Sequence, residues 1–388
     1  MLVDRRTEPA ALGPTAPEVE PNDDARRAQV LESGARVAAA IGSATDVDCY
    51  RLRGPAVPGD LGAAGADGGG PPVVLGFVAA GPADHALVLE LLDGRGRAIV
   101  ARSAGAGERA TLSYLRIDPA GAVIRVRAPV PKGAPPIAAP VAYALEYAAR
   151  ALGADEEPVP ELEPDDQPAT AIALPPRGAL TGRLDGPDDR DVVALPPLEG
   201  GATYRVELAA IPELAMELRL RAGGATLATA RGGKGGELRL RNLPGAADAP
   251  LVLVLRAVDG TSATPYTLRV ATEPPLASGV EREPNDDRAH ASRLAAGDAV
   301  AGYLWPGDVD WYCADAPIGA RVDGLADVDW RLELTDADGN TLAKADAGRR
   351  GAGEELAPDP RARCVRVSGR PRDTAYDEPY RLTLLPAR

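Results

Sequence analysis

Apolar and polar residues alternate along most of this chain, and the alternation has a period of two. Three such runs lead directly into glycine-containing turns, and they span residues 87–92, 216–221 and 330–335. A period of two places successive side chains on opposite faces of a strand, and alternation into a glycine turn is typical of β-hairpins. The pattern therefore predicts a chain built from short β-strands.

Each hairpin is followed by two more strand-like segments in the same order. A late strand is expected at 123–127, 251–256 and 364–368, and a closing strand that starts with tyrosine at 143–147, 266–270 and 380–384. Several short strands with Gly and Pro turns within about 110 residues predict a β-sandwich. One short helix is expected per repeat, for example over Ala25–Leu31, with Asp23 or Asp24 as its N-cap.

One acidic phrase occurs three times, as Glu-x-Glu-Pro-Asn/Asp-Asp. The copies begin at Glu18, Glu161 and Glu281, and each is followed about 26 residues later by an Asp-x-Asp pair. A single copy would be a solvated loop, but three copies at a nearly fixed distance indicate a repeated unit. The repeat brings two acidic loops together, which favours binding of a hard cation.

The repeats divide the chain into three expected domains. We expect a disordered lead (1–17), a first domain (18–150), a linker (151–160), a second, divergent domain (161–272), a linker (273–280) and a third domain (281–388). Both linkers contain proline and acidic residues, which make a linker semi-rigid. These boundaries predict a string of separate modules, and we expect the chain to be a monomer.

Bulk composition excludes some classes of function. The chain has 388 residues and a net charge of −14, which argues against nucleic-acid binding because that requires a basic surface. No stretch approaches the roughly 20 apolar residues of a membrane span. The first residues contain no apolar signal core, so the sequence leaves open whether the protein is cytoplasmic or begins after a removed leader.

Three cysteines are too few for a disulfide framework. Cys313 and Cys364 share the third repeat and could pair if their strands are neighbours, whereas Cys49 stands alone in the first. Their positions in the alternation place both on the solvent-facing side, so the sequence leaves the pairing open.

The combined motifs resemble the bacterial pre-peptidase C-terminal domain. The third repeat is the most similar, with Glu283-Pro-Asn-Asp, Gly302 followed by Asp-Val-Asp-Trp-Tyr312, Leu332-x-Leu-x-Asp and Val365-Arg-Val. This resemblance covers most of the chain as three tandem copies. It implies an all-β fold of three tandem jelly-roll-like β-sandwich domains, joined by short Pro/acidic linkers. Members of the family are accessory modules of secreted bacterial proteins, often peptidases.

The similar collagen-binding domains of secreted bacterial collagenases hold calcium with this acidic segment and a later Asp pair. Carried over by position, the resemblance implies the following metal ligands: Glu18, Glu20, Asn22, Asp23, Asp46 and Asp48; Glu161, Glu163, Asp165, Asp166, Asp189 and Asp191; Glu281, Glu283, Asn285, Asp286, Asp308 and Asp310. The second repeat departs from the pattern, with Asp165 in place of Asn and Val193 in place of the tyrosine at positions 50 and 312.

The residues themselves are suited to calcium. Ca²⁺ takes six to eight oxygen ligands, and each phrase offers four oxygen-bearing side chains in six residues. Carboxylates gathered in one place repel one another, and a cation would offset that repulsion. The alternative is that Asn-Asp caps a helix and Asp-x-Asp forms a solvated turn.

Catalysis has little support in the sequence. The two histidines, His85 and His290, lie in different repeats, and no motif of a serine hydrolase, zinc peptidase or dithiol enzyme occurs. We therefore expect a non-catalytic, calcium-stabilised binding or spacer protein, secreted or in the cell envelope. Two alternatives stay open: a regulatory or targeting partner of a secreted peptidase, and an adhesin-like module that binds a matrix protein or polysaccharide.

Overall fold

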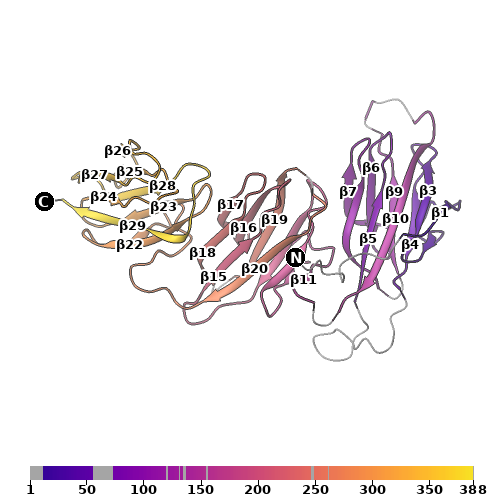
Figure 1. Ribbon diagram of the computed structural model, residues 1–388, viewed down its shortest axis with the longest axis horizontal. Helices are drawn as coiled ribbons and strands as arrows, with labels where there is room; N and C mark the ends of the chain where they lie inside the picture. Colours follow the sequence, from indigo (N-terminus) through magenta and orange to yellow (C-terminus); the bar gives the residue numbers. More distant parts are fainter. Residues whose placement is uncertain are drawn as a thin grey trace. The chain divides into compact units, whose positions relative to one another are not determined.

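The computed structural model describes residues 12–55, 73–118, 121–130, 132–133, 137–153, 156–245, 249–260 and 262–387. All regular elements within these ranges are β-strands, as Figure 1 shows. We call residues 18–150, 161–272 and 281–388 the first, second and third repeat, and we assign each strand that crosses or lies just outside these bounds to the nearest repeat. The predicted disordered lead (1–17) lies partly outside the described residues, and its last three residues form strand β1.

The strands follow the predicted order in each repeat. In the first repeat they are β1 (Thr15–Pro17), β2 (Gln29–Leu31), β3 (Arg36–Ile41), β4 (Asp48–Leu52), β5 (Val74–Ala80), β6 (Leu87–Leu92), β7 (Ala98–Ala104), β8 (Ala110–Arg116), β9 (Ala122–Arg127) and β10 (Val141–Ala151). In the second they are β11 (Val159–Pro160), β12 (Ile172–Ala173), β13 (Ala179–Gly182), β14 (Arg190–Leu195), β15 (Thr203–Leu208), β16 (Ala215–Ala222), β17 (Ala225–Arg231), β18 (Leu238–Pro244), β19 (Leu251–Asp259) and β20 (Tyr266–Glu273). In the third they are β21 (Ser292–Arg293), β22 (Ala299–Leu304), β23 (Val309–Cys313), β24 (Ile318–Val322), β25 (Arg331–Thr335), β26 (Thr341–Ala345), β27 (Glu354–Leu356), β28 (Cys364–Ser368) and β29 (Ala375–Pro386).

Two sheets form in each repeat, and the chain passes back and forth between them. The orders are β1-β3-β10-β5-β8 with β2-β4-β9-β6-β7, then β11-β13-β20-β15-β18 with β12-β14-β19-β16-β17, then β22-β29-β24-β27 with β21-β23-β28-β25-β26. Most neighbouring strands are antiparallel, whereas the short edge strands β1, β2, β11 and β21 pair in parallel.

The predicted architecture of three tandem jelly-roll-like β-sandwich domains is wrong. The fold is all-β, but the winding of consecutive strands from one sheet to the other is a β-solenoid of about 13 turns. Alternation with a period of two shows which face of a strand is buried, and it does not show which strands become neighbours. This is why the sequence pattern identified the strands and not the path of the chain.

Contacts between Cα atoms divide the chain into two compact units. The N-terminal unit comprises the described residues up to Ile172, with 180–190 and 262–265, and the C-terminal unit comprises 173–179, 191–260 and 266–387. In the N-terminal unit, a hydrophobic core lies between the two sheets of the first repeat and contains Val37, Leu145, Leu89 and Ile124. In the C-terminal unit, the core of the third repeat is built in the same way around Trp330 and Leu382.

The predicted short helix after each acidic phrase is also wrong. In the first repeat, the Asp24 carboxylate accepts hydrogen bonds from the backbone amides of Arg26 and Arg27, at 2.7 and 3.1 Å, and so closes a single turn. The next residues, Gln29–Leu31, then pair with β4 as a parallel strand. Aspartate that bonds the backbone locally stabilises turns in preference to helices, and sheet pairing then takes over the remaining backbone groups.

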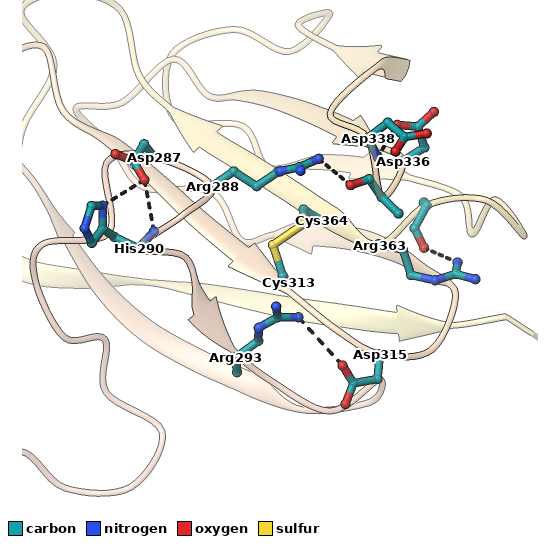
Figure 2. Close-up of a disulfide and its surroundings, with 12 residues drawn as sticks. Asp287, Arg288, His290, Arg293, Cys313, Asp315, Asp336, Asp338, Arg363 and Cys364 are labelled. Carbon is teal, nitrogen blue, oxygen red and sulfur yellow. Dashed lines mark hydrogen bonds and ion pairs between the residues drawn. A yellow bond between two sulfur atoms is a disulfide. The ribbon is translucent and has the colours of Figure 1, made fainter.

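A disulfide joins Cys313 and Cys364 in the third repeat, which answers the question that the sequence left open. The two cysteines are directly opposite each other on the antiparallel strands β23 and β28. Figure 2 shows the bond with Arg293 and Arg363 nearby. Both cysteines are buried, which differs from the predicted solvent-facing side. Cys49 is a buried free thiol.

We expect that Glu217→Gln destabilises the C-terminal unit. Glu217 is fully buried and forms ion pairs with Arg219, Arg231 and Arg256. Despite its burial, hydrogen bonds from Arg256 and Arg231 lower the pKa of Glu217 to about 2. The stabilisation is thus present above the unfolded pKa of 4.5 and is lost as the pH falls toward 2.

Calorimetry at pH 7 should show that Glu217→Gln lowers the free energy of unfolding by about 1 kcal/mol or more. The loss is smaller than for a fully buried ion pair because the arginines are partly exposed to solvent. The exposed Glu199→Gln removes the same charge and serves as the control. Equal stability of the two variants at pH 7 would show that this ion-pair network contributes nothing.

Candidate metal centres

The acidic phrase and the Asp-x-Asp pair lie side by side in the first and third repeats. The amide of Cys49 donates a hydrogen bond to the carbonyl of Asn22 at 3.0 Å, and Trp311 donates to Asn285 in the same way at 2.9 Å. These bonds fix the phrase against the start of β4 and of β23. The two acidic loops therefore meet, as the sequence predicts.

The first glutamate of each phrase is held by a backbone amide of the same repeat. Ala40 donates to Glu18, Arg183 donates to Glu161, and Tyr303 donates to Glu281. The second glutamate accepts a bond from the amide two residues later in all three repeats, at 2.9–3.1 Å. The local geometry is thus the same in each copy.

A pair of tyrosines links the carboxylates in the third repeat. The Tyr312 hydroxyl donates to Glu281 at 2.7 Å, and the Tyr380 hydroxyl donates to Asp310 at 2.6 Å. The two hydroxyls lie 2.6 Å apart. These tyrosines bind one oxygen of each acid and so orient both carboxylates. The second oxygen of Glu281 accepts the Tyr303 amide, whereas Oδ1 of Asp310 has no partner among the described residues.

The first repeat contains the same network. Tyr50 donates to Glu18 at 3.0 Å, and Tyr143 donates to Asp48 at 2.6 Å. Sequence reasoning treated these tyrosines only as part of the strand pattern and missed their place at the site. The available signal was their repetition, since the closing strand begins with tyrosine in every repeat.

Carboxylate oxygens converge at one point in the first repeat and at one point in the third. Each of the two groups lies within one compact unit and offers oxygens within 4.8 Å of one another, and the groups are Glu18, Glu20 and Asp48; and Glu281, Glu283 and Asp310. These acidic clusters could hold a metal ion. Carboxylate oxygens of this kind are the preferred ligands of hard cations.

Several oxygens at the third cluster lack a protein partner. Among the described residues, nothing donates a hydrogen bond to Glu283 Oε1, Asp310 Oδ1 or Asn285 Oδ1, and all three side chains are buried. The first cluster has the same feature at Asp48 Oδ1 and Asn22 Oδ1. A buried oxygen without a partner is costly, so each of these atoms is poised to accept a ligand.

Electrostatics at the third cluster disfavour several negative charges together. Burial, followed by repulsion from neighbouring carboxylates, raises the pKa values of Glu283 and Asp308 well above their usual range. Burial raises the pKa of Glu281 to about 7 and that of Asp48, in the first cluster, to about 8. Within the part of the chain that the structure describes, no arginine or lysine forms an ion pair with Glu283, Asp308 or Asp310.

The remaining predicted ligands lie around these groups. In the first repeat, Asn22 donates to Glu18 at 3.0 Å, Asp46 accepts from Gly42 at 2.5 Å, and Asp23 is exposed. In the third repeat, Asp308 accepts hydrogen bonds from the backbone amides of Trp305 and Val309, at 3.3 and 3.0 Å, and burial raises the pKa of Asp286. In the second repeat, Glu163, Asp166 and Asp189 are grouped instead around the guanidinium of Arg102, a residue that the sequence did not indicate.

Comparison with known proteins gives no family for this chain. No protein-family model matches it, and no curated protein matches it. Among solved structures, it is similar to the PBSX exported protein XepA, with 13% identity, 61% of this chain and 86% of that chain covered, and a TM-score of 0.19. It is also similar to the CUB1-EGF-CUB2 domains of rat MASP-1, with 7% identity, 54% and 92% covered, and a TM-score of 0.17. A third match is the BSP domain of a biofilm associated protein, with 11% identity, 74% and 55% covered, and a TM-score of 0.12.

Within the described residues, no helix combines the length and apolarity that crossing a lipid bilayer requires.

The raised pKa values predict an inverted pH dependence in metal-free protein. Between pH 4.5 and about pH 7, Glu281 keeps its proton in the folded chain and releases it in the unfolded chain. Its contribution to stability is therefore full below pH 4.5 and is lost as the pH rises through 7. Thermal unfolding in EDTA should thus show a melting temperature that falls from pH 5 to pH 8.

Glu281→Gln stays neutral at every pH and should flatten this slope in the C-terminal unit. Exposed Glu355→Gln in β27 is the matched control and should leave the slope as it is. A melting temperature that rises from pH 5 to pH 8 in EDTA would contradict the raised pKa values.

Proposed function

We propose that this chain is a non-catalytic binding or spacer protein whose tandem β repeats are stabilised by calcium. The observation that carries the proposal is the third cluster, where buried oxygens of Glu283, Asp310 and Asn285 have no hydrogen-bond partner among the described residues. A cation with six to eight oxygen ligands would satisfy these atoms and remove the repulsion between the acids. Calcium suits the site better than magnesium, which dehydrates reluctantly and keeps several waters.

The position of the acidic phrase suggests what the metal would do. The amide of Glu163 donates to the carbonyl of Tyr114 on β8, at 3.0 Å and within the N-terminal unit. The amide of Glu283 donates to Asn242 on β18, at 3.3 Å and within the C-terminal unit. The second and third phrases therefore each contact a strand of the preceding repeat. A metal bound there would stiffen the joint between consecutive repeats.

A secreted or cell-envelope location is part of the proposal. The disulfide between Cys313 and Cys364 favours an oxidising compartment, since disulfides are rare in the cytosol. Calcium is also plentiful outside cells, where modules with dissociation constants of about 10⁻⁴–10⁻³ M can be saturated. A spacer in this setting gains from joints that resist unfolding and proteolysis.

Thermal unfolding of the full chain in EDTA, calcium and magnesium tests the proposal. Calcium at about 100 times its dissociation constant should stabilise the protein by about 2.7 kcal/mol per site, which is a rise of several degrees. Magnesium at the same concentration should have a much smaller effect. If the melting temperature does not respond selectively to calcium, the acidic segments are only turns and the proposal is wrong.

The variant Glu283→Gln/Asp310→Asn separates metal binding from simple damage to the fold. Both changes keep the shape of the side chains and remove buried charge, so the C-terminal unit should be at least as stable in EDTA as in the wild type. Its calcium response should be lost. The exposed Glu355→Gln is the control and should keep the full response. A double variant that still responds to calcium would place the ligands elsewhere.

A further inference from the structure

Arg102 is a buried cation at the acidic phrase of the second repeat. It lies on β7 of the first repeat, is only 3% exposed, and belongs to the same compact unit as the acids it contacts. Its Nη2 atom is 2.5 Å from Glu163 and 3.3 Å from Asp166, and it also donates to Asp189. We call these four residues the Arg102 cluster.

The three acids of the Arg102 cluster correspond to Glu283, Asp286 and Asp308 of the third repeat. The correspondence rests on sequence position and on identical backbone bonds. Glu163 and Glu283 each accept a hydrogen bond from the amide two residues later. Asp189 and Asp308 each accept one from the amide at the start of their own loop, that of Asp185 and of Trp305. In the part of the chain that the structure describes, the same acidic arrangement thus forms ion pairs with an arginine in the second repeat and with none in the third.

The strand that faces the third repeat explains the difference. β17 is the counterpart of β7, and its residues 226–229 are Thr, Leu, Ala and Thr. Within the C-terminal unit, these residues line a cavity of about 350 Å³ together with Pro284, Asp286 and Gly307. In the N-terminal unit, the guanidinium of Arg102 lies among the corresponding acids. The third repeat has room there for a cation and its water, and the second repeat has its cation built in.

We propose that Arg102 substitutes for a metal ion at the second repeat, so that one joint of the chain closes without metal while the third repeat takes a cation. The second half of this proposal rests on the proposed function, whereas the first half does not. A guanidinium suits the role because its donors lie in a rigid fork and it stays charged at any physiological pH. Ser113 adds to the same joint by donating to Asp185 through its hydroxyl at 2.8 Å.

Arg102→Ala in the full chain tests the substitution. The change leaves Glu163, Asp166 and Asp189, which all contact the Arg102 guanidinium, without their cation. In EDTA, the melting temperature of the N-terminal unit should fall by several degrees. Millimolar calcium should restore it, and native mass spectrometry should count one more calcium per chain than in the wild type. Exposed Arg95→Ala on the same hairpin removes the same charge and should behave like the wild type.

A second variant keeps the proposal testable if Arg102→Ala does not fold. Arg102→Met/Glu163→Gln/Asp189→Asn removes the buried charges on both sides, so it should be more stable in EDTA than Arg102→Ala and should show no calcium rescue. If Arg102→Ala and Arg95→Ala have the same melting temperature in EDTA, the proposal is overturned. A loss that calcium does not restore, or a triple variant no more stable than Arg102→Ala, would overturn Arg102 as a substitute for metal.

The outcomes separate this proposal from the proposed function. If the wild type shows no calcium response but Arg102→Ala is destabilised in EDTA and rescued by calcium, the substitution stands and the metal role of the other repeats fails. If the wild type responds to calcium but Arg102→Ala matches Arg95→Ala, the metal role stands and the substitution fails.

Discussion

Burial of several carboxylates at one point is the constraint on which the rest of this structure depends. The acidic phrase must lie against the Asp-x-Asp strand, because Asn22 and Asn285 form backbone hydrogen bonds there. That contact removes the acids from water, and the charged form of a buried carboxylate is strongly disfavoured. Such acids are stabilised by donors beside them, which here are tyrosine hydroxyls and backbone amides, or by a positive charge.

The three repeats meet this constraint in different ways. In the first, Glu20 and Asp23 remain exposed, so water can solvate part of the charge. In the second, Arg102 supplies the positive charge from the preceding repeat. In the third, Glu283 and Asp308 are buried and have no ion pair among the described residues, and their chain neighbours Pro284 and Gly307 line a cavity. The acidic framework is shared, and what differs is how its charge is offset: by water in the first repeat, by Arg102 in the second and, as we propose, by a bound metal ion in the third.

Much of this could be predicted from the sequence, since it depends on local patterns. The period of two identified the strands, and the repeated acidic phrase identified carboxylates such as Glu281 and Asp310 that the structure brings together. The winding of the chain between sheets could not be predicted, because alternation does not specify which strands pair. Arg102 was also missed, because it is 61 residues from Glu163 and only the folded chain brings them together. The short edge strands such as β2 were mistaken for helices, since their parallel pairing leaves no hairpin signal.

Terbium luminescence tests the central claim, that the buried acids of the third repeat bind a calcium-like cation. Tb³⁺ replaces Ca²⁺ at oxygen sites and emits when a nearby tryptophan is excited. All three tryptophans are in the third repeat, and the Trp305 amide donates to Asp308 at 3.3 Å. The account predicts sensitised emission that calcium displaces and that Glu283→Gln/Asp310→Asn abolishes. The absence of calcium-displaceable emission from the wild type would contradict it.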